Sequence, residues 1–82
     1  MNQDEVKGVL SQALPGCQVT VTVDGSHFNL VVVSDLFQGA RTVKRQQMVY
    51  GALARPIASG AIHAVNMLTL TPAEWAERQN QG

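Results

Sequence analysis

The chain has 82 residues, a formal net charge of zero, a hydrophobic fraction of 45% and a charged fraction of 15%. These values exclude a disordered protein and indicate one small globular domain, residues 1–82, with a core at about 3–79. No apolar run reaches the roughly 18 residues of a membrane span, and the polar start MNQDEVKG is unlike a signal peptide. With a single cysteine, Cys17, an internal disulfide is also excluded, and we expect a cytoplasmic protein without membrane contact.

The first half of the chain predicts a helix followed by an antiparallel hairpin. Residues 3–14 carry one helical apolar stripe, formed by Val6, Val9, Leu10, Ala13 and Leu14. Residues 18–23 alternate valine with threonine, which is typical of a half-buried strand. The turn DGS leads into residues 27–34, HFNLVVVS, whose apolar run favours a central strand.

The second half predicts a crossover helix, a strand and a last helix. After a connector at 35–39, a helix begins near Thr42, and we expect a kink or restart near Arg55-Pro56 and an end at Ser59-Gly60. Its predicted shared face consists of Val43, Tyr50, Leu53 and Ile57. Residues 62–70 form the third strand.

The last helix has a clear start signal. Thr71 is the expected N-cap, Pro72 takes the first helical position, and Glu74 completes a capping box. Trp75 is expected to pack on the sheet. The order α-β-β-α-(α)-β-α predicts an α/β (α+β) domain with a three-stranded mixed sheet.

The two histidines are predicted to converge. A helical crossover between neighbouring strands normally makes them parallel, so His27, which opens the second strand, and His63, second in the third, would emerge at one end of the sheet. His27 alone is also compatible with a solvated strand end, and His63 with a core histidine bonded to a carbonyl. As metal ligands they form a half-site that needs a partner, because a closed zinc site takes four ligands.

Basic residues gather in the segment 41–55. Arg41, Lys44, Arg45 and Arg55 occur there without an acid, so the segment carries +4 and the rest of the chain −4. This pattern predicts either a docking surface for an anionic partner or a solvated helix face.

Enzymatic motifs are absent from the sequence. There is no CxxC, no glycine-rich phosphate loop and no HExxH. Cys17 is best interpreted as a half-buried thiol, and we predict that the protein is not an enzyme.

Three blocks of the chain resemble BolA-like proteins, especially the IbaG (YrbA) branch. They are SHFNLVVVSDLFQG, VKRQQMVYGAL and AIHAVNMLTLTPAEWA, in the order and spacing of the family. The resemblance implies a class II KH-like fold and a monothiol glutaredoxin partner. The pair would share a glutathione-bound 2Fe–2S cluster in iron–sulfur trafficking or assembly, or in iron and stress sensing.

The resemblance implies His63 as one cluster ligand, because it matches the family histidine before the last helix. The second family ligand lies in a loop that is here shortened to Asp24-Gly25-Ser26, so His27 is our inferred substitute; Asp24 is a harder and less suitable ligand. We expect the cluster to be lost below about pH 6, near the ordinary histidine pKa.

Other functions stay open at this point. Nucleic-acid binding through the KH-like fold and Arg41, Lys44 and Arg45 is the alternative, although the GxxG loop of KH domains is missing. A glutaredoxin complex without metal and a homodimer of the chain alone are also left open.

Overall fold

The computed structural model describes residues 2–25, 27–60, 62 and 64–80. The predicted α+β order is confirmed, with a 3₁₀ helix η1 in the expected connector. The elements are α1 (Gln3–Ala13), β1 (Gln18–Asp24), β2 (His27–Val33), η1 (Asp35–Phe37), α2 (Thr42–Ala52), α3 (Ala54–Ala58), β3 (Ala64–Leu70) and α4 (Pro72–Asn80). Within these described ranges, no helix is long and apolar enough to cross a membrane.

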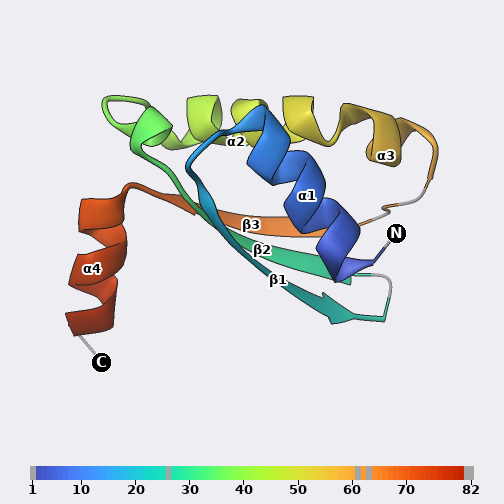
Figure 1. The fold of residues 1–82 in the computed structure, drawn as a ribbon, viewed down its shortest axis with the longest axis horizontal. Helices are drawn as coiled ribbons and strands as arrows, with labels where there is room; N and C mark the ends of the chain where they lie inside the picture. The colour runs from blue at the N-terminus through green and yellow to red at the C-terminus, as the bar shows by residue number, and fades with distance from the viewer. Residues whose placement is uncertain (1, 26, 61, 63, 81–82) are drawn as a thin grey trace.

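The three strands form one mixed sheet in the order β1-β2-β3. β1 and β2 pair antiparallel, and β2 and β3 pair parallel, as the crossover argument predicts. Figure 1 shows α1 and α2 on one side of the sheet and α4 beyond the end where β3 finishes. The β2–β3 pairing therefore brings the beginnings of these two strands to the opposite end from α4.

The core lies between the sheet and the helices α1 and α2. Alternate β2 residues are buried, because successive side chains of a strand point to opposite faces. The core cluster contains Val6, Leu10, Leu14, Val21, Phe28, Leu30, Val32, Phe37, Val49, Leu53 and Ile62. Phe37 of η1 is fully buried within this cluster.

The predicted apolar face of α2 and α3 is wrong. Only Leu53 of that set is buried, whereas Val43 and Tyr50 are 64% and 45% exposed and Ile57 is also exposed. The face that turns inward consists of Arg45, Met48, Val49, Ala52 and Leu53, at spacings i, i+3, i+4, i+7 and i+8. An arginine occupies the first position of this stripe, so a count of apolar residues alone selected the neighbouring face.

The helix break also lies earlier than predicted. α2 ends at Ala52 and α3 begins at Ala54, so the break is at Leu53 and not at Arg55-Pro56. A proline ring clashes with the carbonyl four residues before it, and for Pro56 that residue is Ala52. The proline thus takes the third position of a new helix, where it needs no intrahelical N–H bond.

The capping box of α4 is confirmed. The Glu74 backbone N–H donates to Thr71 Oγ1 at 3.2 Å, and the Thr71 N–H donates to Glu74 Oε1 at 2.8 Å. These two bonds satisfy backbone donors at the helix start. They also fix the Glu74 carboxylate close to the end of β3.

Arg45 joins four parts of the fold. Its Nε donates to the Ala40 carbonyl at 2.9 Å, and its Nη1 donates to the Thr69 carbonyl of β3 at 3.2 Å. The same Nη1 lies 2.7 Å from Glu74 Oε1 of α4. The guanidinium carbon lies 5.9 Å from the Phe37 ring centroid, close enough for a cation–π contact.

We predict that Arg45→Ala lowers the free energy of unfolding by about 3 kcal/mol, because two carbonyls lose charge-assisted hydrogen bonds of roughly 1.5 kcal/mol each. Urea denaturation followed by Trp75 fluorescence measures the change. Arg41→Ala is the control, since that side chain is exposed and makes no cap bond, and it should change stability by less than about 0.5 kcal/mol. Equal effects of the two substitutions would contradict this account of Arg45.

The stability contribution of Glu74 should depend on pH. The hydrogen bond from Arg45 and the bond from the Thr71 N–H lower the pKa of the Glu74 carboxyl. A lowered pKa favours the folded state above the unfolded-state value of about 4.3, and this stabilisation is lost as pH falls through the lowered pKa. The stability difference between wild type and Glu74→Gln should therefore shrink in strong acid. A difference that stays constant from neutral to strongly acidic pH would disprove the linkage.

Candidate functional site

His27 lies at an exposed end of the sheet. It is the first residue of β2, its side chain is exposed, and its register partners are Asp24 on β1 and Ala64 on β3. His63 lies outside the described residues, but Ala64, the next residue in the chain, begins β3. The predicted parallel pairing thus places His27 beside the sequence neighbour of His63, while the meeting of the two imidazoles stays a prediction.

A pair of amides follows His27 along the sheet. Asn29 and Asn66 are register partners, and Asn66 Nδ2 donates to Asn29 Oδ1 at 3.2 Å. Asn29 is two residues after His27, so both side chains point to the same face of β2. The opposite β2 face carries the buried Phe28, Leu30 and Val32. The histidine end therefore continues into a hydrogen-bonding strip on the sheet face that points away from the core.

The donor set at this end suits a shared metal group. An exposed imidazole can ligate iron through nitrogen, and Asp24 beside it offers only a hard carboxylate. Among the described residues, no group of three or more His, Cys, Asp and Glu side chains could hold a metal ion. The predicted site needs only two ligands from this chain, His27 and His63, so it is smaller than a group of three.

Cys17 lies at the other end of the sheet. It precedes β1, whose first residue Gln18 pairs with Val33 at the end of β2, whereas Asp24 pairs with His27. Its thiol donates to the Leu10 carbonyl at 3.6 Å, and burial raises the pKa of the Cys17 thiol. These features fit the predicted half-buried thiol.

The predicted basic residues divide into two kinds. Arg41 and Lys44 are exposed at the start of α2, whereas Arg45 is bonded to Ala40, Thr69 and Glu74 within the fold. Because its guanidinium is engaged within the fold, Arg45 is less available than Arg41 and Lys44 for binding a partner. The bond to Thr69 also places the start of α2 near the end of β3. His27 pairs with Ala64 at the beginning of β3, so the structure does not bring Arg41, Lys44 and Arg45 to His27.

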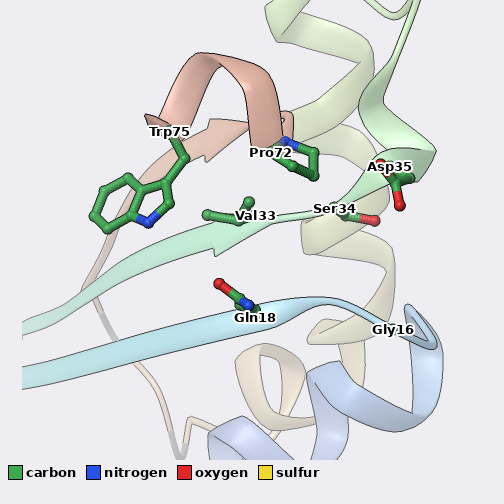
Figure 2. A pocket seen from close by; sticks show the side chains of 7 residues that line it. All are labelled: Gly16, Gln18, Val33, Ser34, Asp35, Pro72 and Trp75. Atoms are coloured by element: carbon green, nitrogen blue, oxygen red, sulfur yellow. The ribbon is translucent and has the colours of Figure 1, made fainter. Parts of the chain in front are cut away.

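A hollow of about 350 Å³ lies where α4 meets the sheet. Figure 2 shows the Trp75 ring beside Val33, with the Gln18 side chain across from both. Gly16, Ser34, Asp35 and Pro72 complete its lining. Trp75 therefore faces the sheet across this hollow, its expected packing on the sheet stays a prediction, and the hollow itself was not predicted. It lies at the far end of β2 from His27.

Comparison with known proteins decides the family. Residues 10–74 match the model of a protein family described as BolA-like protein. The chain belongs to the BolA-like family. It is 49% identical over 76 residues to the acid stress protein IbaG of Escherichia coli K12, covering 93% of this chain and 90% of that protein.

Solved BolA structures have the same fold. A BolA homologue from Coxiella burnetii matches with a TM-score of 0.81 and 30% identity, over 93% of this chain and 97% of the other. The BolA domain of SufE1 from Arabidopsis thaliana matches with a TM-score of 0.77 and 33% identity, over 90% and 98%. BolA-like proteins are in general not enzymes; that this chain is not one stays a prediction.

Proposed function

We propose that this BolA-like protein binds a monothiol glutaredoxin and that His63 and His27 co-ligate a glutathione-bound 2Fe–2S cluster between the two proteins. The observation that carries the proposal is the parallel register of β2 and β3. It sets exposed His27 beside Ala64, the residue that follows His63. An imidazole at the first position of β2 and one on the residue that precedes β3 in the sequence would make a half-site that cysteine thiolates from the partner and glutathione can complete.

The pairing of β2 with a strand on each side supports this role. β2 is the central strand, paired on both sides, and His27 begins its ladder with β1 and β3. A ligand at the end of a paired strand keeps its position without help from a long loop. The shortened turn, Asp24-Gly25-Ser26, contains neither an imidazole nor a thiol. His27, the residue that follows it, is therefore favoured as the second ligand.

The name of one relative agrees with imidazole ligation. The Escherichia coli relative at 49% identity is called an acid stress protein. Imidazole binds a metal only in its neutral form, so mild acid competes with the cluster for the same nitrogen. We therefore infer that cluster transfer or sensing by this protein responds to acid.

Nucleic-acid binding is the second candidate. It is favoured by three exposed cations: Arg41 immediately before α2, Lys44 on α2 and Arg55 on α3. Neither helix contains an acidic residue. The internal bonds of Arg45 weaken it, because they leave fewer free cations for phosphate contacts. We therefore rank it below the cluster-binding role.

Replacement of either histidine should destabilise the shared cluster. When the protein is reconstituted anaerobically with a monothiol glutaredoxin and glutathione, visible absorption and circular dichroism should show a 2Fe–2S cluster. We expect His63→Ala to lose most of this signal and His27→Ala to release the cluster faster.

Cys17→Ser is the matched control and should retain the wild-type spectrum, because Cys17 lies at the other end of the sheet. An unchanged spectrum in His63→Ala would remove that ligand from the proposal. Salt-sensitive binding to a DNA duplex, with no glutaredoxin complex, would instead favour the second candidate.

The cluster should also be lost in mild acid. Protonation of a histidine ligand removes the nitrogen lone pair from iron, because imidazole binds a metal only in its neutral form. We expect the cluster signal of the complex to fall below about pH 6. A 2Fe–2S protein complex whose cluster is held by cysteine thiolates alone is the control and should keep its signal to lower pH. Identical pH profiles for the two complexes would contradict imidazole ligation.

A further inference from the structure

Among the described residues, no strand pairs with the outer edge of β1. β1 is the first strand in the order β1-β2-β3, and all seven of its residues are in continuous register with β2. In an antiparallel pair, every second residue turns its N–H and C=O groups away from the partner. Natural edges are usually blunted by lysine, proline or a bulge, but β1, QVTVTVD, contains neither residue and its register has no bulge.

The opposite edge of the sheet, β3, is partly covered by a side chain. On β3, the carbonyl of Thr69 accepts a hydrogen bond from Arg45, whose side chain crosses from α2. Continued strand pairing along β3 would have to displace this internal bond. β1 is therefore the edge better suited to adding another strand.

The sequence of β1 is symmetric about its middle residue, Val21. In an antiparallel pairing of two copies centred there, Val19 lies opposite Val23, and Thr20 opposite Thr22. The only charged residue of the strand, Asp24, falls opposite the neutral Gln18 and not opposite a second carboxylate. β-Branched pairs of this kind stabilise sheets, and opposed like charges would weaken them.

We propose that two copies of this chain pair antiparallel through β1, with the two-fold axis at Val21, so that their sheets join into one. The symmetry favours a second copy over a foreign strand, because an isologous contact requires a self-complementary sequence. Thr20, Thr22 and Val23 are all exposed in the single chain and available for it. The contact borders the proposed cluster site only at Asp24, whose register partner on β2 is His27, whereas β3 lies at the other edge of the sheet.

The dimer should be weak and concentration-dependent. One seven-residue edge buries much less surface than the roughly 1,200–2,000 Å² of a stable interface. Backbone hydrogen bonds and the valine pairs provide the affinity, as in other cases of strand addition. Analytical ultracentrifugation up to millimolar concentration is therefore the suitable measurement.

A charge-swap experiment tests the register. In Thr20→Lys/Thr22→Lys, each introduced lysine faces a lysine of the second copy, so dimerisation should be lost; Thr20→Glu/Thr22→Glu should lose it for the same reason. An equimolar mixture of the two variants should associate, because every opposed pair is then of opposite charge. Ser11→Lys/Gln12→Lys, on the exposed face of α1, adds the same charge elsewhere and should dimerise like wild type.

Three results would overturn the proposal. The first is a wild-type chain that stays monomeric at millimolar concentration. The second is a dimer that persists in both charged β1 variants while their circular dichroism shows the native fold. The third is a mixture of the two folded variants that associates no better than either alone, which would mean that the contact has another register or another surface.

Discussion

The parallel pairing of β2 with β3 is the constraint on which the rest of the structure depends. It requires a crossover, which α2 and α3 supply, and it brings the beginnings of the two strands to one end of the sheet. The same crossover carries Arg45, whose guanidinium links α2 to the end of β3 and to α4. The strand ends away from α4 are the ends that bear the exposed His27 and adjoin His63.

The histidine end and the basic start of α2 lie at opposite ends of the sheet, and the β1 edge meets the histidine end only at Asp24, the register partner of His27. Arg45 places the start of α2 near the far end of β3, away from His27. The β1 edge lies across the central strand from β3. Substitutions at Thr20 and Thr22, whose β2 partners are Val31 and Asn29, would therefore alter self-association without replacing a proposed cluster ligand.

Local sequence patterns were sufficient for much of the fold. The valine–threonine alternation of β1 and the Thr71–Glu74 capping box depend on neighbouring residues, and both were predicted correctly. The inward face of α2 was not, because Arg45 is held there by the Thr69 carbonyl and the Glu74 carboxylate from distant parts of the chain. The early helix break had a local cause in Pro56, whose effect reaches back four residues to Ala52. At the candidate site, the crossover rule predicted the parallel register correctly, whereas the role of each histidine depends on a partner that this sequence does not contain.

The central claim is that this chain contributes histidine nitrogen to a shared iron–sulfur cluster. Pulsed electron paramagnetic resonance of the reduced complex, with isotopically labelled histidine in this chain alone, tests it most directly. The account predicts nitrogen couplings from two histidines in wild type, one of which disappears in His63→Ala and the other in His27→Ala. A reduced cluster without any coupling to the labelled nitrogen would contradict it.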